Sequence, residues 1–293
     1  MNLYYYIIIC ILLIMPVILY FLIKINFSTY PKLKKILEKI STNDKDFMNF
    51  GYWKNNPQTL SDANKELCNL LIKKGKLHKA EKILDVGCGY GEQDLLWYKC
   101  NHKKHRIKIK GIDIETIHIK GAQKLIKKNN LDKTITFKLG DACNIPYKKE
   151  MFDHVISLES AFHYSPRKIF FKEAHRVLKS DGKLVIADIV LRNNCGLLGK
   201  YASYIAADFM MVPMCNTEDK ELWVKQLEKE GFEVDYEIIT NDTFLPYFDN
   251  IIHNFSHDDY LINIAWYVFV NIWRYICKQY LPFDYVLAVC TKK

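Results

Sequence analysis

Residues 82–91 read Lys-Ile-Leu-Asp-Val-Gly-Cys-Gly-Tyr-Gly, and this stretch decides the fold of the chain. Its first half is a short apolar run of the kind that forms a buried strand, and three glycines follow at every second position. Glycine lets the backbone turn tightly and lets a ligand approach without meeting a Cβ atom. Residues 92–100 then show a helical pattern, which would present free backbone N–H groups at its start. This order predicts a ligand site at the end of the first strand.

Outward from this turn, strand-like runs alternate with helical patterns, which is typical of a doubly wound sheet. With 49% hydrophobic and 26% charged residues, the composition excludes a disordered chain. We therefore predict an α/β fold with a mostly parallel, seven-stranded sheet. The expected strands are 82–86, 107–114, 135–139, 154–158, 183–188, 232–239 and 284–291, and the expected helices are 92–100, 116–129, 167–178 and 218–230.

The spacing of Gly87, Gly89 and Gly91 separates two classes of ligand. In the dinucleotide-binding fingerprint the third glycine falls three residues after the second. That position is Glu92 here, and its carboxylate would repel a pyrophosphate. The pattern therefore favours a nucleoside ligand without phosphates, although such a turn can also be purely structural.

Carboxylates follow the second and third expected strands. Asp113 ends the second strand and Asp141 ends the third. Open α/β sheets bind ligands at the carboxyl ends of their strands. Asp113 could accept hydrogen bonds from two ribose hydroxyls, and Asp141 could accept one from an adenine amino group. Either acid alone could be a solvated loop residue, but with the glycine turn they predict one nucleoside-binding edge.

Five motifs occur in a fixed order from residue 82 to residue 190: KILDVGCGYGEQDLLW, GIDI, LGDACNIPY, FDHVISLESAFHY and EAHRVLKSDGKLVIAD. In this order they resemble the class I S-adenosylmethionine-dependent methyltransferases. GEQDLLW, SLESAFHY and the upstream FMNFGYW resemble the small-molecule branch that includes the erythromycin-type O-methyltransferases. The resemblance implies a Rossmann-like methyltransferase fold, S-adenosylmethionine as the cofactor, and helical lid insertions at about 191–217 and 244–283.

The resemblance also implies a set of site residues. His163 follows the fourth strand, and a neutral imidazole with a pKa of about 6.5 could take a proton from an alcohol or phenol. It could also be a hydrogen-bonded structural histidine. Glu159 is the other candidate in the catalytic region, either as a ligand of the cofactor's ammonium group or as an ordinary loop carboxylate. The expected cofactor-binding residues are Tyr52, Asp85, Gly87, Gly89, Gly91, Asp113, Asp141 and Ala142.

Metals and nucleic acids are not expected partners. His102 and His105 lie among lysines and an arginine, which disfavours a bound cation. Methylases of exocyclic base amines carry D/N-P-P-Y/F after the fourth strand, where this chain reads Leu-Glu-Ser-Ala, and no Pro-Cys pair is present for cytosine carbon-5 chemistry. The net charge of +9 comes largely from scattered lysines. We therefore predict no metal site and regard nucleic acid as an improbable partner.

The amino terminus predicts a membrane anchor. Leu3–Ile23 is an uncharged, strongly apolar run, and as a helix it would span about 31 Å, which matches a bilayer core of about 30 Å. A cleaved signal peptide fits less well, because no basic residue precedes the run and no small-residue cleavage site follows it. We expect a transmembrane anchor at 1–25, a juxtamembrane linker at 26–50 and a methyltransferase domain at 51–293.

The flanking residues predict the orientation of that anchor. Lys24, Lys32, Lys34 and Lys35 follow the apolar run, and positive residues stay on the cytosolic side of a membrane. The nine cysteines include no C-x-x-C pair, and free thiols suit a reducing compartment. We therefore expect the catalytic domain to face the cytosol.

Together these observations predict a membrane-anchored methyltransferase that acts on a hydrophobic small molecule or lipid-like acceptor, with O-methylation favoured. The alternatives are a non-catalytic membrane scaffold with a methyltransferase fold and a tethered protein or RNA methyltransferase. Residues 259–280 form an expected helix whose apolar face is wider than a surface helix needs. We expect part of that face, including Trp266 and Trp273, to line an acceptor pocket that opens toward the bilayer.

Overall fold

A computed structural model of the chain describes residues 47–101, 107–192, 210–254 and 283–293, together with 203, 204, 207, 208, 267 and 271. The chain divides into two units, Met1–Lys45 and Asp46–Lys293, and all of these residues belong to the second. Within them, no helix is both long and apolar enough to cross a membrane. The predicted anchor, the histidines at 102 and 105, and Trp266 and Trp273 lie outside the described residues, so these predictions stay predictions.

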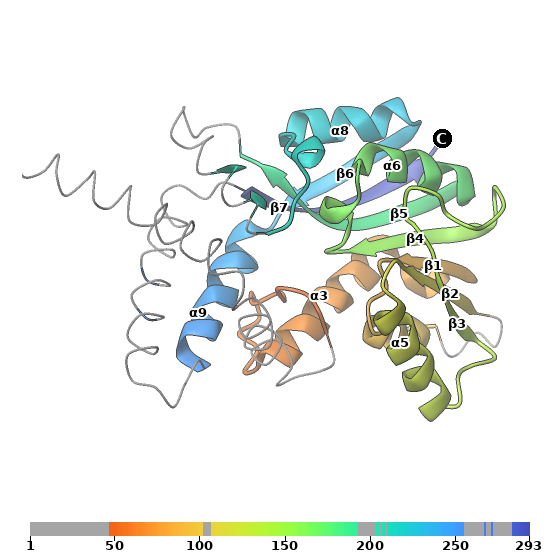
Figure 1. The fold of residues 1–293 in the computed structure, drawn as a ribbon, viewed down its shortest axis with the longest axis horizontal. Coiled ribbons are helices and arrows are strands. Elements are labelled where there is room, and N and C mark those ends of the chain that lie inside the picture. The colour runs from red at the N-terminus through yellow and green to blue at the C-terminus, as the bar shows by residue number, and fades with distance from the viewer. Residues whose placement is uncertain are drawn as a thin grey trace, which may run out of the picture. The chain divides into compact units, whose positions relative to one another are not determined.

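Seven strands form one sheet in the order β3-β2-β1-β4-β5-β7-β6 (Figure 1). The neighbours from β3 to β5 run parallel, whereas β7 runs antiparallel to both β5 and β6. The mostly parallel, seven-stranded sheet is therefore confirmed, and the reversed β7 makes it a mixed sheet. The strands are β1 (Lys82–Val86), β2 (Lys108–Asp113), β3 (Ile135–Leu139), β4 (Phe152–Leu158), β5 (Leu178–Leu191), β6 (Phe232–Ile238) and β7 (Phe283–Lys292).

Helices cover both faces of the sheet. In Figure 1, α3 and α5 lie on one face and α6 and α8 on the other. α4 packs with α3 on the first face, and α9 follows β6. The helices are α3 (Leu60–Gly75), α4 (Glu92–Lys99), α5 (Thr116–Lys128), α6 (Arg167–Val177), α8 (Lys220–Lys229) and α9 (Phe244–Asn254).

Two apolar clusters hold these layers together. Leu67 of α3 and Trp97 of α4 pack on one side of the sheet. Phe171 of α6 and Trp223 of α8 pack on the other, with their rings in an edge-to-face contact 5.9 Å apart. Because helices cover both faces, a ligand reaches the sheet at the carboxyl ends of its parallel strands.

We did not predict α3, although its boundaries are encoded locally. The Thr59 hydroxyl accepts the N–H of Asp62 at the start of the helix, which is ordinary N-capping. At the other end, Lys76 adopts φ 55°, and its N–H bonds carbonyls of the last turn. The helix covers β5 and β7 with its buried leucines, so the domain begins earlier along the chain than its first strand.

Candidate active site

The glycine turn after β1 has the backbone conformation that its sequence predicts. Gly87, Gly89 and Gly91 adopt φ of 73°, 53° and 81°, a region that other residues rarely occupy. A Cβ atom on Gly87 would lie 2.4 Å from Ser160 Oγ, so packing alone requires glycine there. A Cβ atom on Gly89 would meet only the Met48 sulfur, at 3.6 Å. The turn therefore has a free face above Gly89, which a ligand could approach closely.

Asp113 lies beside this turn, where β2 ends. Its Oδ2 accepts the Gly89 N–H at 3.0 Å, and its Oδ1 accepts the Glu115 N–H at 2.9 Å and lies 3.1 Å from His118 Nδ1. Burial by itself would raise the pKa of Asp113, but the hydrogen bonds from His118 and from the two backbone N–H groups hold that pKa below its usual value. An ionised carboxylate is thus fixed against the glycine turn. We did not predict His118, because nothing in the order of residues marks it.

We expect Asp113→Ala to weaken binding of S-adenosylhomocysteine about ten- to hundredfold, because a charge-assisted hydrogen bond contributes about 1.5–3 kcal/mol. Titration calorimetry on the full chain measures this change. Asp132→Ala is the matched control, since Asp132 is an exposed carboxylate just beyond α5. An unchanged affinity in a folded Asp113→Ala variant would remove Asp113 from the cofactor site.

Asp141 and Ala142 follow β3 next to this position. The Gly140 N–H donates to the Asp113 carbonyl at 3.0 Å, so the ends of β2 and β3 are directly connected. Asp141 is exposed, and its Oδ1 accepts the Cys143 N–H at 2.8 Å. Ala142, the next residue, is buried. The structure therefore brings Asp113 and Asp141 to the same edge of the sheet.

Residues 47–53 contribute to the site from before α3. Tyr52 is half-buried against the cluster on the α3 side, and its N–H donates to the Ala63 carbonyl at 2.9 Å. Met48, which we did not predict, lies over Gly89 and is largely exposed. Its flexible thioether is suited to covering a ligand of variable shape.

Asp85 forms a buried pair of carboxyl groups with Asp94, which we did not predict from the sequence. Its Oδ2 accepts the Trp97 Nε1–H at 3.0 Å, and both Asp85 and Asp94 of α4 are fully buried. Burial raises the pKa of Asp85 to about 6, although hydrogen bonds with Trp97, Gln93 and Asp94 lower it. Burial and the neighbouring Asp85 carboxyl raise the pKa of Asp94 well above its usual value. Two such carboxyls share a proton rather than both ionise.

The acid pair predicts a pH-dependent gain of stability in Asp94→Asn. Both folded pKa values lie above the unfolded value of about 3.9, so from about pH 4 up to those folded values the folded state holds protons that the unfolded state has lost, and stability falls as the pH rises. The wild-type protein therefore loses stability in that range. The carboxamide carries no charge and can donate a hydrogen bond to Asp85. We expect a higher melting temperature than wild type at pH 8 and a smaller difference at pH 5.

Thermal melts at both pH values test this expectation, with Asp132→Asn as the exposed control. A variant that melts below wild type at pH 8 would contradict the shared-proton arrangement.

Glu159 is a buried carboxylate that directly follows β4. Its φ of 49° is unusual for a residue with a side chain. Oε1 accepts the Phe50 N–H at 2.9 Å and the Tyr285 hydroxyl at 2.6 Å, and Oε2 also lies 3.0 Å from the Phe50 nitrogen. Burial raises the pKa of Glu159 to about 8, although the bonds from Tyr285 and Phe50 lower it. In this structure Glu159 fastens residues 47–53 to β7, and its predicted contact with the cofactor stays a prediction.

His163 lies on the short 3-10 turn Ala161–His163 after β4, and it is exposed. Its Nδ1 is 3.1 Å from the Met211 carbonyl oxygen. A carbonyl only accepts, so Nδ1 carries the proton and Nε2 is left with a free lone pair. The surrounding protein desolvates the imidazole and lowers its pKa below the usual value, although the bond to Met211 raises it. The ring is therefore neutral at pH 7, as a general base requires.

The His163 turn is joined directly to the glycine turn. The Tyr164 and Ser160 hydroxyls both donate to the Val86 carbonyl, at 2.8 and 3.0 Å, and lie 2.7 Å from each other. Val86 immediately precedes Gly87, so the candidate base and the candidate cofactor turn share one hydrogen-bonded support. Among the residues that the structure describes, no group of three His, Cys, Asp or Glu side chains could hold a metal ion.

Comparisons with known proteins agree with this geometry. Residues 77–243 match a family described as a methyltransferase domain. The chain is 31% identical to erythromycin 3''-O-methyltransferase of Saccharopolyspora erythraea, over 86% of this chain and 85% of that protein. It is 27% identical to methyltransferase GfsG of Streptomyces halstedii, over 70% and 71% of the two chains.

Among solved structures, the chain resembles geranyl diphosphate C-methyltransferase from Streptomyces coelicolor A3(2), solved with Mg²⁺, geranyl diphosphate and S-adenosyl-L-homocysteine. The TM-score is 0.64 with 16% identity, over 80% of this chain and 82% of that one. At this identity the likeness concerns the fold alone.

Proposed function

This chain belongs to the methyltransferase domain family, and from that membership we propose that it transfers a methyl group from S-adenosylmethionine to a hydroxyl oxygen of a hydrophobic small molecule. The predicted family, enzyme class and cofactor are confirmed by the family match and the relatives. The choice of acceptor is our proposal. The observation that carries it is the neutral His163, whose Nδ1 bonds the Met211 carbonyl of a segment with exposed apolar side chains, which leaves Nε2 unprotonated.

The residues at the strand ends fit this cofactor. The face of Gly89 is free of protein atoms apart from the Met48 sulfur, which lets a ligand lie close to the backbone. Asp113 is held ionised beside it, and Asp141 is exposed at the next strand end. The bound cofactor supplies a methyl group that is already activated by its sulfonium. The chain therefore has to align the acceptor, exclude water and remove one proton.

We assign that proton transfer to His163. A hydroxyl oxygen that receives a methyl group must lose its proton, and Nε2 can accept it in the same step. Since the pKa of His163 is lowered from its usual value, the imidazole is in the base form at neutral pH. An amine acceptor with a free lone pair would have no such need of a base, so a positioned neutral histidine favours O-methylation.

Exposed methionines support a hydrophobic acceptor. Met48, Met211 and Met214 expose 61%, 70% and 65% of their surface, although large apolar residues are usually covered. Met211 carries the carbonyl that holds the His163 ring, and Met48 covers the glycine turn. Flexible thioethers are common on surfaces that bind varied apolar ligands. The similarity to an erythromycin 3''-O-methyltransferase agrees with a large organic acceptor.

The test is transfer of labelled methyl groups from S-adenosylmethionine to matched acceptors. We would offer the full chain a series of apolar alcohols and phenols together with their amine analogues and free sugars. We expect label in ethers of the apolar hydroxyl compounds. Label confined to amines or sugars would contradict the proposed acceptor.

Residues 3–23 lead us to extend this proposal to a membrane-anchored, cytosol-facing enzyme whose acceptor can be lipid-like. An enzyme tethered by a transmembrane helix would meet a membrane-dissolved acceptor in two dimensions. Extraction of membranes from cells that express the full chain tests the anchor. We expect the protein to resist alkaline carbonate and to dissolve in detergent. Release by carbonate, or recovery without membranes, would contradict it.

A further inference from the structure

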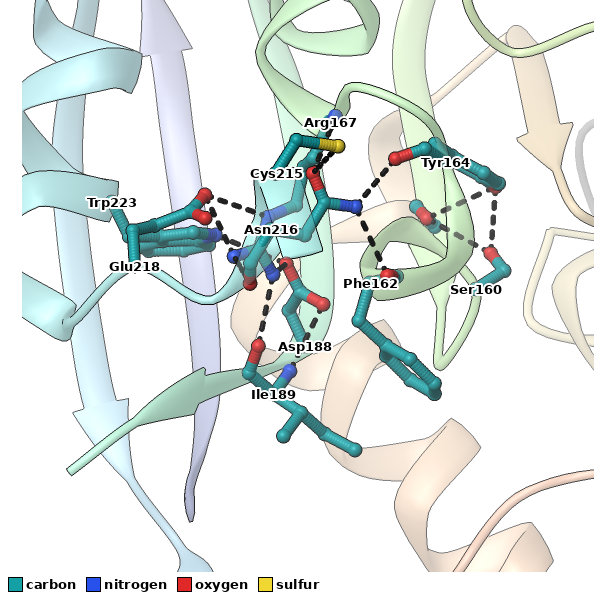
Figure 2. A network of polar contacts seen from close by, with 11 residues as sticks. Ser160, Phe162, Tyr164, Arg167, Asp188, Ile189, Cys215, Asn216, Glu218 and Trp223 are labelled. Carbon is teal, nitrogen blue, oxygen red and sulfur yellow. Dashed lines mark hydrogen bonds and ion pairs between the residues drawn. The ribbon is translucent and has the colours of Figure 1, made fainter. Parts of the chain in front are cut away.

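Asn216 holds the chain on both sides of His163. It lies at the end of the short turn Met214–Asn216 and is almost fully buried. Its side-chain nitrogen donates to the Phe162 carbonyl at 3.0 Å and to the Tyr164 carbonyl, as Figure 2 shows. These are the carbonyls of the residues immediately before and after His163. One amide therefore fixes the peptide groups that flank the candidate base.

The orientation of that amide is itself determined. Asn216 Oδ1 accepts the Arg167 N–H at 2.9 Å, and the Asn216 carbonyl accepts Arg167 Nη2 at 3.2 Å. The guanidinium is paired with Asp188 at 2.7 Å and with Glu218 at 2.8 Å, and all three side chains are buried. A flipped amide would place its oxygen against two carbonyls and its NH₂ group against an N–H donor. The surrounding bonds therefore allow one orientation.

The same segment also holds the imidazole ring. Met211, five residues before Asn216, supplies the carbonyl that accepts the Nδ1 proton of His163. Residues 211–216 thus bond the ring through a main-chain oxygen and the neighbouring backbone through one side chain. Since a carbonyl cannot donate, this arrangement fixes the tautomer with Nε2 unprotonated.

We propose that Asn216 is a positioning residue for His163, which keeps the turn Ala161–His163 seated against residues 211–216 so that the ring proton stays on Nδ1 and Nε2 is aimed at the acceptor hydroxyl. This inference rests on the proposed function of His163 as a base. It adds the device that holds that base, on a segment more than fifty residues away along the chain.

The turn needs such a device because it has few bonds of its own. A 3-10 turn of three residues has little internal stability, and His163 is exposed. A displacement of about 1 Å in a catalytic group can cost about 10²-fold in rate. A buried amide with two donors and a fixed acceptor is a rigid means to prevent that displacement.

The first experiment compares Asn216→Ala and Asn216→Asp with the wild-type full chain. The aspartate keeps an acceptor for the Arg167 N–H but loses both donors to the carbonyls. We expect kcat to fall about 10- to 100-fold in both variants, as for other small misplacements, with affinity for S-adenosylhomocysteine within about twofold of wild type. Thr217→Val is the matched control, because Thr217 is only half-buried and its hydroxyl donates to the Met214 carbonyl within its own turn. It should keep wild-type kcat.

The pH profile separates positioning from general damage. In the wild-type protein, desolvation lowers the pKa of the His163 imidazole, and the distant Asp188 carboxylate raises that pKa. If the turn loosens, water reaches the ring, and the acid limb of kcat should move up toward about 6.5. A structural defect alone would lower kcat at all pH values without moving that limb. A kcat and a pH profile like wild type in Asn216→Asp would overturn the proposal.

Nitrogen-15 NMR of the imidazoles gives a readout that does not depend on turnover, with His163→Gln to identify the signal. In the wild-type protein we expect the Nδ1-protonated tautomer. In the Asn216 variants we expect a mixture of tautomers. An Nε2-protonated wild-type ring would overturn the proposal even if the variants fail to fold. If His163→Ala keeps full turnover, the proposed base is wrong, and the tautomer alone then decides whether Asn216 positions the ring.

Discussion

Replacing His163 with alanine is expected to lower turnover about 10²–10⁴-fold, the range that a positioned general base contributes. Affinity for S-adenosylhomocysteine should change little, because the ring bonds the Met211 carbonyl and not the glycine turn. Single-turnover rates and calorimetry on the same preparation separate the two quantities. The loss should be largest with weakly acidic alcohols and smaller with acidic phenols, which lose their proton more readily.

His78→Ala is the control for this experiment, because His78 is an exposed histidine on a turn before β1. Turnover of His163→Ala equal to wild type across the whole acceptor series would leave alignment as the enzyme's main contribution. In that case, the hydroxyl proton leaves to water or to another group, and His163 is not the base.

Arg167→Met is expected to destabilise the domain by about 3–5 kcal/mol, the effect of breaking a buried ion pair. The guanidinium bonds Asp188 and Glu218, and the Trp223 indole N–H also donates to Asp188 at 3.0 Å (Figure 2). Methionine can fill much of the space but leaves two buried carboxylates without a partner cation. Denaturant unfolding of the detergent-dissolved full chain measures the change.

A second arginine–aspartate pair, nearer the surface, allows the stability cost of breaking the buried pair to be compared. Arg192 bonds Asp284 at 2.7 Å, but 38% of its side chain is exposed, so Arg192→Met should cost no more than about 1 kcal/mol. Adding Asp188→Asn and Glu218→Gln to Arg167→Met should recover part of the loss, because the uncompensated charges are then removed. Equal effects of the two arginine substitutions would show that the buried network contributes little to stability.

The strand, turn and helix around Gly87–Gly91 could be predicted because their signals are local. Glycines at positive φ and apolar runs of strand length depend on near neighbours, and β1 begins and ends where the sequence indicates. The same holds for β3 and for the start of α5. The family resemblance also followed from local motifs, and the comparisons confirm it.

The direction of β7 and the roles of several polar residues could not be predicted in this way. A strand pattern has the same period in either direction, so antiparallel pairing with β5 and β6 follows only from the path of the chain. Asp94 in the first turn of a helix is typical of an exposed acid that favours the helix dipole, yet packing buries it against Asp85. Glu159 likewise has its partners on residue 50 and on β7.

The sequence by itself determined the α/β fold, the glycine turn and the carboxylates at the ends of β2 and β3, because each depends on spacing within a few residues. Only the tertiary structure decided which ring nitrogen of His163 carries the proton and what holds the ring. That outcome depends on the Met211 carbonyl and on the Asn216 amide, about fifty residues further along the chain. Hydrogen bonds over such separations form only when packing has brought the segments together, and no periodic pattern in the sequence records them.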